Sequence, residues 1–197
     1  MRAVLAALVA VVLVVLAVGV LSLYADQEVE VPIVGSSDEI VADFDGLPPT
    51  RGYWLVVDSY RGRLEVYRGT ERIREATCST GSGNALRDPQ TGKMWVFQTP
   101  VGERTIHRKV TDPVWTKPDW AFVEEGVEPP LMGSVDRVDR SSLGDYALYL
   151  GDGYMIHGTL FQTLLGRRIT HGCIRLGDDD LRWVYEKVPV GTRVYIY

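Results

Sequence analysis

Apolar residues follow two different patterns along the chain. Residues 3–25 form a nearly continuous apolar run, with Arg2 as its only flanking cation. At about 1.5 Å per helical residue, about 20 residues cross the roughly 30 Å hydrocarbon core of a bilayer. The run exceeds the apolar part of a cleavable signal peptide, so we expect an uncleaved transmembrane anchor over 1–25, with a cleaved signal segment as the alternative. Arg2 on its short side directs the remaining chain outside the cytoplasm, to the periplasmic side of the cell envelope.

Short apolar runs beyond this segment predict β-strands, because many alternate with polar residues and turn residues separate them. The expected strands are 53–57, 63–67, 73–78, 94–98, 146–150, 154–156 and 193–196. The first three are close enough in sequence to form a meander. One helix is expected at 178–187, where Asp178, Asp179 and Asp180 suit the free N–H groups of a helix N-terminus and Pro189 follows its end. The chain is therefore expected to fold as a mainly β domain with one helix near its C-terminus.

The domain boundaries follow from composition. Residues 26–50 are acidic, contain three prolines and show no sustained periodicity, so we interpret them as a linker. Residues 51–197 suit one domain with its own core. Within it, residues 111–142 form a long segment rich in Pro, Trp and charge, which is typical of a lid or binding loop. We expect Trp115, Trp120 and Phe122 to form the core of this loop, with packing against a glycan or peptide as the alternative.

The chemistry is concentrated in Thr170–Leu176, which contains a thiol, an imidazole and a guanidinium. If this segment is extended, His171, Cys173 and Arg175 share one face. His171 then lies about 6.6 Å along the strand from Cys173, too far for proton transfer over about 2.6–3.2 Å. A histidine on a neighbouring strand fits better, because opposed Cβ atoms lie about 5 Å apart. We therefore expect Cys173 as nucleophile and His157 as base, with His171 as a supporting or oxyanion-binding residue.

Several segments, in this order along the chain, resemble the YkuD-type L,D-transpeptidase catalytic domain, a family of bacterial cell-wall enzymes. The strongest are Ile156–Thr159, Leu165–Arg167, Thr170–Leu176 and Val188–Val194; the weaker ones are Ser79–Gly81, Thr99–Gly102 and Lys117–Trp120. The resemblance extends roughly from Tyr53 to Tyr197. It implies a β-sandwich of the L,D-transpeptidase type.

The resemblance also implies an activity. The cysteine of this family attacks the amide between the L-centre of meso-diaminopimelate, or a related diamino acid, and the terminal D-alanine of a peptidoglycan stem tetrapeptide. The acyl group then passes to an amine. This assigns Cys173 as nucleophile and His157 as proton donor and acceptor, with N–H groups near Gly172 and Cys173 stabilising the oxyanion. Arg175 is expected to bind a substrate carboxylate, because its planar fork suits that group. The remaining expected substrate-binding positions are Gly158 and Thr159.

Two other functions remain open at this stage. The same site could work chiefly by hydrolysis, as an L,D-carboxypeptidase, or the domain could bind the wall without catalysis. A zinc site formed by His157, His171 and Cys173, with His107 as a further ligand, has suitable ligand types but no usual spacing, so no metal is expected. The net charge of −5 and the lack of a basic cluster argue against nucleic acid. No cofactor is implied.

Cys78, Arg167 and Arg168 also bear on these expectations. Cys78 and Cys173 are the two cysteines of the chain, and a disulfide between them would remove the nucleophile. We instead interpret Cys78 as a small buried hydrophobic residue. Arg167 and Arg168 are interpreted as part of a solvated loop, with a substrate site as the alternative.

Overall fold

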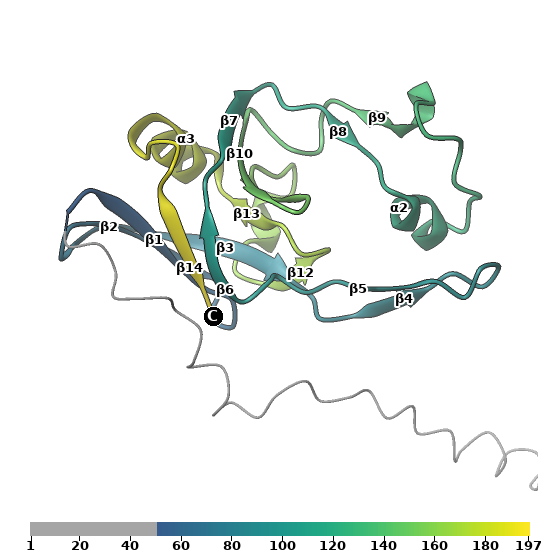
Figure 1. Ribbon diagram of the computed structural model, residues 1–197, viewed down its shortest axis with the longest axis horizontal. Coiled ribbons are helices and arrows are strands. Elements are labelled where there is room, and N and C mark those ends of the chain that lie inside the picture. The colour runs from purple at the N-terminus through teal and green to yellow at the C-terminus, as the bar shows by residue number, and fades with distance from the viewer. Residues whose placement is uncertain (1–50) are drawn as a thin grey trace, which may run out of the picture. The chain divides into compact units, whose positions relative to one another are not determined.

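The computed structural model describes residues 51–197, which form a mainly β domain (Figure 1). The expected anchor at 1–25 and linker at 26–50 lie outside these residues. Within 51–197, no helix is long and apolar enough to cross a membrane. The strands are β1 (Tyr53–Asp58), β2 (Arg63–Arg68), β3 (Glu71–Gly81), β4 (Ala85–Arg87), β5 (Met94–Val96), β6 (Gly102–Thr105), β7 (Arg108–Thr111), β8 (Trp115–Thr116), β9 (Val138–Asp139), β10 (Tyr146–Gly151), β11 (Tyr154–His157), β12 (Arg168–Thr170), β13 (Ile174–Leu176) and β14 (Arg193–Ile196). The helices are α2 (Asp119–Glu124), α3 (Asp178–Lys187) and two short 3₁₀ turns, η1 (Val135–Arg137) and η2 (Gln162–Leu164).

The main sheet is continuous and runs in the order β6-β14-β1-β2-β3-β13-β11-β10-β7, with β12 paired to β3. Strands β1, β2 and β3 form the expected antiparallel meander. The long strand β3 belongs to both halves of the sheet, because it pairs with β2 along its first part and with β13 and β12 near its end. The mainly β prediction is confirmed, and the two layers of the expected sandwich are halves of one curled sheet.

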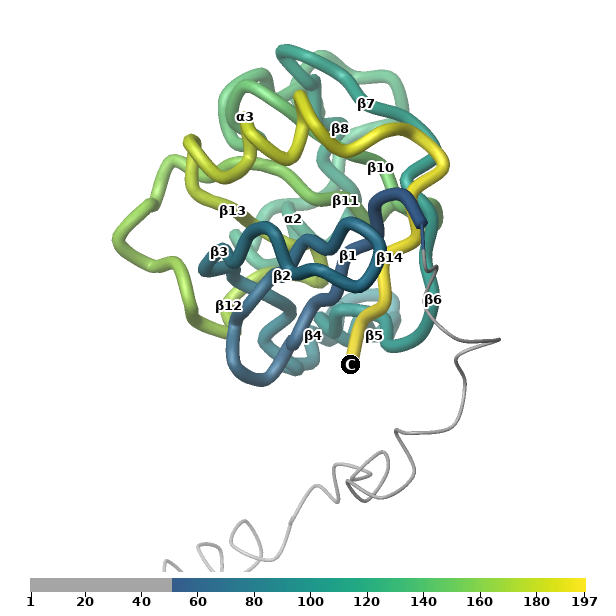
Figure 2. Tube along the Cα trace, turned by 90° about the vertical axis from the view of Figure 1, so that its left-hand side faces the viewer, coloured from purple at the N-terminus to yellow at the C-terminus, as the bar shows by residue number. Residues whose placement is uncertain are grey.

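The core lies inside this curl, where alternate residues of each strand are buried. Both halves and α3 contribute to one cluster of inaccessible side chains, among them Leu55, Val57, Leu64, Val66, Leu148, Ile156, Ile174, Leu176, Leu181 and Val184. Figure 2 shows α3 above the pair β1–β2. A second, smaller cluster consists of Leu143, Ala147 and Met155, and Trp115, Tyr149 and Cys173 pack against it.

The two helices differ in how well the sequence predicts them. Helix α3 has the expected bounds, with three aspartates in its first turn. Helix α2 lies within the long segment 111–142, where the sequence predicts no helix. It has six residues and begins after Pro118, too short for a clear helical period. The buried guanidinium of Arg137 fixes the segment around it, because it donates to the carbonyl oxygens of Pro130 and Lys117 and to the carboxylate of Asp119.

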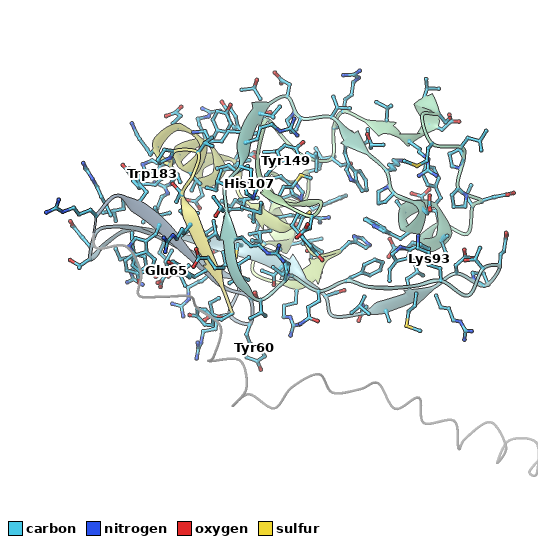
Figure 3. The ribbon with its side chains drawn as sticks, viewed as in Figure 1. Tyr60, Glu65, Lys93, His107, Tyr149 and Trp183 are labelled. Atoms are coloured by element: carbon cyan, nitrogen blue, oxygen red, sulfur yellow. The ribbon has the colours of Figure 1, made fainter. Side chains whose placement is uncertain are left out.

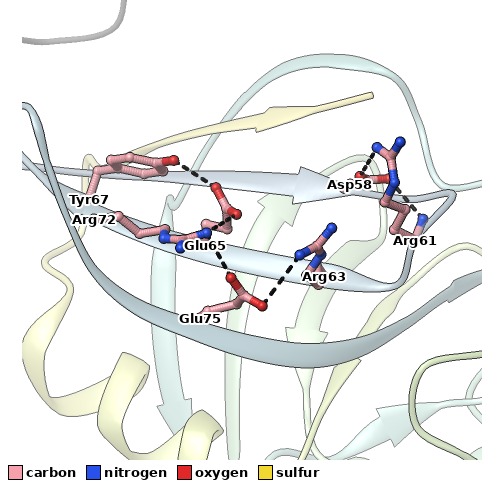
Figure 4. A network of polar contacts seen from close by, with 7 residues as sticks. All are labelled: Asp58, Arg61, Arg63, Glu65, Tyr67, Arg72 and Glu75. Carbon is pink, nitrogen blue, oxygen red and sulfur yellow. Dashed lines mark hydrogen bonds and ion pairs between the residues drawn. The ribbon is translucent and has the colours of Figure 1, made fainter.

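A network of charged and polar side chains covers the outer surface of β1–β3 (Figure 4). Arg72 contacts both Glu65 and Glu75 at 2.7 Å, and the Tyr67 hydroxyl donates to Glu65 at the same distance. Arg63 pairs with Glu75 at 3.5 Å, and Arg61 pairs with Asp58 at 3.0 Å. Each of the seven side chains drawn therefore has a polar partner.

Candidate active site

Three of the predicted site residues come together on one face of the sheet. Strands β11 and β13 are parallel neighbours, with Ile156 beside Ile174 and His157 beside Arg175. The two isoleucines point into the main core, so His157 and Arg175 point to the opposite face. Ala147 pairs with His157 and belongs to the small cluster against which Cys173 packs. The structure thus places the buried imidazole beside the guanidinium, and the thiol packs in the cluster that contains Ala147, the strand partner of His157.

His171 lies elsewhere, which corrects the expected strand geometry. Strand β12 ends at Thr170 and β13 begins at Ile174, and Gly172 between them has φ +121°, so the chain turns here instead of continuing as a strand. The prediction that His171 shares a strand face with Cys173 and Arg175 is wrong. Its ring stacks on Trp120 at 4.1 Å, and its Nε2 lies 2.8 Å from the Glu124 carboxylate. His171 therefore joins α2 to the turn of residues 171–173, which carries the candidate nucleophile and is called the nucleophile turn below.

The remaining aromatic residues of the long segment form its interior. Phe122 is buried, and Trp120 packs against Trp115 at 5.7 Å and against Phe97 at 5.4 Å. The expectation of a loop core is consistent with this packing. Because Trp120 also stacks on His171, the loop core continues directly into the nucleophile turn.

Two buried threonines fix the turn that carries the nucleophile. Thr170 Oγ1 donates to the carbonyl oxygen of Cys173 at 2.6 Å and accepts the Gly172 N–H at 3.1 Å. Thr99 Oγ1 donates to the Gly172 carbonyl at 2.9 Å and accepts the Gly81 N–H at 2.8 Å. The sequence analysis missed these roles, because a threonine near a strand usually indicates only β-propensity. Their position inside the family-like segments was the available signal.

Gly172 also has a steric reason to be glycine. A Cβ at this position would lie 2.8 Å from Tyr154 Cε1 and 3.0 Å from the Gln98 carbonyl oxygen. Since the Gly172 N–H already bonds to Thr170, it is not free to meet an oxyanion in this arrangement. The Cys173 N–H has no acceptor among residues 51–197, so it is the better placed of the two donors.

Their surroundings favour the neutral forms of His157 and Cys173. Burial first, and the charge of Arg175 second, lower the pKa of His157 from 6.5 to about 4, against the opposing effect of the Gly158 and Leu143 carbonyls. Burial raises the pKa of the Cys173 thiol, although an N–H of Met155 and the Arg175 charge act the other way. At neutral pH these shifts favour the thiol and the neutral imidazole.

The hydrogen bonds of these groups agree with that state. Nδ1 of His157 is buried and makes no hydrogen bond within ordinary limits, although the Gly158 and Leu143 carbonyls lie near the ring. The thiol itself lies 3.8 Å from the Gly153 carbonyl oxygen. Formation of the imidazolium would improve the interaction with both carbonyls.

Arg175 is a largely buried cation without a protein anion. Its Nε is buried and unpartnered, and burial lowers the pKa of its guanidinium. No salt bridge joins it to a carboxylate in the described part of the chain. A buried guanidinium of this kind is well suited to bind an anionic group of a ligand.

Gly158 and Thr159 shape the chain after β11. A Cβ on Gly158 would lie 3.1 Å from Gly144 Cα and 3.2 Å from the Leu143 carbonyl oxygen, so two backbones meet closely here. Thr159 is buried; its Oγ1 accepts the Phe161 N–H at 3.0 Å. Their expected contacts with substrate remain a prediction.

The second cysteine lies on the other face of the sheet. Cys78 on β3 pairs with Leu176 and is buried in the main core, whereas Cys173 packs in the small cluster. Both thiols are free, as expected. Burial raises the pKa of Cys78 to about 12, so it is a packing residue and not a second nucleophile.

His107 lies against β10. It lies beside Tyr149 (Figure 3), to whose carbonyl its backbone N–H donates at 2.9 Å. Residues 51–197 contain no group of three potential metal ligands, so the structure gives the zinc alternative no support.

A thiol and an imidazole on one face of a curled sheet form the kind of site that cysteine acyltransferases use. The chain belongs to the YkuD family, the L,D-transpeptidase catalytic domain, which matches residues 52–196. It is 36% identical over 151 residues to the probable L,D-transpeptidase YbiS of Escherichia coli, an alignment that covers 75% of this chain and 45% of YbiS. It is also 36% identical over 156 residues to the probable L,D-transpeptidase ErfK/SrfK of Salmonella typhimurium, covering 76% of this chain and 46% of that protein. The chain thus spans less than half the length of these curated relatives.

Solved structures show the same fold. The L,D-transpeptidase of Xylanimonas cellulosilytica superposes with a TM-score of 0.54 at 20% identity, covering 78% of this chain and 65% of that one. L,D-transpeptidase 3 of Mycobacterium tuberculosis gives 0.53 at 19% identity, covering 74% and 61%. The curled sheet is therefore the scaffold of this family.

Proposed function

We propose that the chain is a peptidoglycan L,D-transpeptidase with Cys173 as its nucleophile. The observation that carries the proposal is the β11–β13 register, which places His157 beside Arg175 on the face where Cys173 packs. Family membership supports the same reaction. The donor would be a stem tetrapeptide and the acyl acceptor an amine.

The proposed acylation uses His157 twice. As Cys173 Sγ attacks the carbonyl carbon of the third stem residue, His157 Nε2 takes the thiol proton and the carbonyl oxygen becomes an oxyanion. The Cys173 N–H stabilises this oxyanion. When the amide C–N bond breaks, the imidazolium gives its proton to the departing D-alanine amine. An acceptor amine then attacks the thioester, losing a proton to His157, and the thiol is regenerated.

Arg175 supplies the charge complement in this scheme. Its unpartnered guanidinium faces the reacting groups, and the carboxylate of the terminal D-alanine is the anion nearest the scissile amide. Binding that carboxylate would offset the cost of burying the guanidinium. It would also hold the amide against Cys173.

The cellular setting is part of the proposal. Peptidoglycan is assembled outside the cytoplasm, and the apolar run at 3–25 suits an anchor that holds the domain there. The acidic, proline-containing segment 26–50 would then act as the tether.

The test is intact-mass spectrometry of the full chain with a stem tetrapeptide or a carbapenem, beside Cys173→Ala. An adduct of the acyl mass on the native protein alone is expected. Loss of this acyl group on adding an amine, with a cross-linked product, separates transfer from hydrolysis. A folded, reduced protein that forms no adduct with either ligand would overturn the proposal and favour a wall-binding module.

A further inference from the structure

A cavity of about 330 Å³ lies next to the nucleophile turn and has no part in the scheme above. It is lined by Ser82, Asn84, Ala85, Leu86, Phe97, Glu124, Arg168, Ile169 and His171. Its walls come from the end of β3, the β4–β5 hairpin, α2 and β12. Figure 1 shows α2 and this hairpin at the end of the domain opposite α3.

Two opposite charges face this cavity without meeting each other. Glu124 contacts His171 through Oε2, which leaves Oε1 without a partner among the described residues. Arg168 donates from Nε to the Gly81 carbonyl at 3.4 Å, and its terminal nitrogens bond to no acceptor in 51–197. No ion pair joins Glu124 to Arg168. The cavity thus presents a carboxylate and a guanidinium separately, and the apolar side chains of Leu86, Phe97 and Ile169 also line it.

We infer that this cavity binds the far end of the diamino acid at the third position of the donor peptide, and that Arg168 selects for a carboxylate there. The inference rests on the proposed function. Glu124 would bind the side-chain ammonium and Arg168 the side-chain carboxylate, as its planar fork suits. The diamino acid would then be of the diaminopimelate class, whose side chain ends in both groups. A lysine side chain offers only the amine.

The distances available to the chain agree with this placement. His171 lines the cavity, and its Cα can be at most about 7.6 Å from that of Cys173, given about 3.8 Å between consecutive Cα atoms. In a diaminopimelate residue, five carbon–carbon bonds of about 1.5 Å separate the attacked carbonyl from the far α-carbon, a reach of about 6 Å. The apolar part of the lining suits the methylene groups of that side chain.

Arg167 and Arg168, interpreted from the sequence as part of a solvated loop, are both exposed but differ in their surroundings. Arg168 begins β12 and lines the cavity, whereas Arg167 precedes the strand and does not. The two adjacent arginines form a matched pair of positions, and Arg167→Gln serves as the control for Arg168→Gln.

The experiment measures single-turnover acylation of the full chain by intact mass. Three tetrapeptides are compared, with diaminopimelate, lysine, or diaminopimelate amidated on its side-chain carboxylate at position three. The native protein should react with the first at least about tenfold faster than with the other two. In Arg168→Gln, the ratio of the acylation rate with the first peptide to the rates with the other two should fall toward one. Arg167→Gln should leave this ratio unchanged. Thermal unfolding confirms that each variant is folded.

The outcomes separate this inference from the proposed function. Equal rates for the three peptides in the native protein would overturn the inference while the acyl-enzyme stands, as would a preference that survives in Arg168→Gln. Absence of acylation with every peptide and with a carbapenem would overturn the proposed function itself.

Discussion

The outer surface of β1–β3 and the face around Cys173 both carry charged side chains, but they differ in how these are paired. On β1–β3 every side chain drawn in Figure 4 has a polar partner, and most of these groups are exposed. On the site face, His157 Nδ1 and Arg175 Nε are buried and unpartnered. Two further buried side-chain atoms of residues 51–197, Ser59 Oγ and Glu103 Oε2, also lack a partner, but only the site face places an imidazole beside a guanidinium in this state. Unsatisfied buried groups cost stability, so this pair indicates groups held ready for a ligand or a proton.

The largest difference should appear in catalysis. Replacing His157 by alanine removes the base that takes the thiol proton, and we expect single-turnover acylation to fall by about 100- to 10,000-fold. His107→Ala is the matched control, because His107 lies beside Tyr149 and the proposed reaction gives it no role. His171→Ala should have a smaller effect than His157→Ala; the reverse order would contradict the assignment of the base.

The second expected difference is in acid stability. The folded-state pKa of His157 is about 4, below its ordinary value of 6.5, so the unfolded chain binds this proton first as the pH falls. Stability should be complete above pH 6.5 and decrease by up to about 3 kcal/mol as the pH falls to 4. Urea unfolding of the native protein and of His157→Gln at several pH values measures how much of the loss of stability comes from His157. Identical pH dependence in the two proteins would show that His157 is not buried in its neutral form.

A smaller effect is expected from the unpaired cation. Arg175→Met removes a buried guanidinium with no protein anion, so the free energy of unfolding should rise by about 1–2 kcal/mol while acylation by a tetrapeptide slows. Arg74→Met is the comparison, since Arg74 pairs with Asp180 at 2.6 Å and its loss should give no gain. Denaturant unfolding of both variants gives the two values. Destabilisation by Arg175→Met would indicate that this side chain is structural.

The smallest effect belongs to the paired surface. Glu65→Gln weakens contacts with Tyr67 and Arg72, yet the free energy of unfolding should change by less than about 1 kcal/mol, and less still in high salt. Denaturant unfolding at low and high ionic strength checks this. If Glu65→Gln lowered the free energy of unfolding by about as much as protonation of His157 does, the two faces would not differ in how strongly their charged groups affect stability.

The sequence predicts well those features that depend on local pattern. The alternating strands, the meander of β1–β3 and the exact bounds of α3 follow from period and end signals close in the chain. Helix α2 and the turn at Gly172 do not, because packing against distant residues decides both. The expectation that His171 shares a face with Cys173 failed for this reason, since one glycine at positive φ ends the strand.

The site shows the same division. Cys173 and His157 could be chosen from residue type and motif, but the pairing of His157 with Arg175 depends on a register between strands far apart in sequence. The support from Thr99 and Thr170 depends on the same kind of contact. Arg168 and Glu124 meet one cavity only because β12 and α2 lie beside the same hairpin.

The placement of the two cysteines on opposite faces determines which oxidation products Cys173 can form. With Cys78 sealed in the core, Cys173 has no internal thiol with which to close a disulfide. Oxidation must therefore stop at a sulfenic acid, form a mixed disulfide with a small external thiol, or continue irreversibly to a sulfinic acid. The first two products are reversible, so recovery of the nucleophile depends on reductants supplied by the surroundings and not on a resolving cysteine of its own.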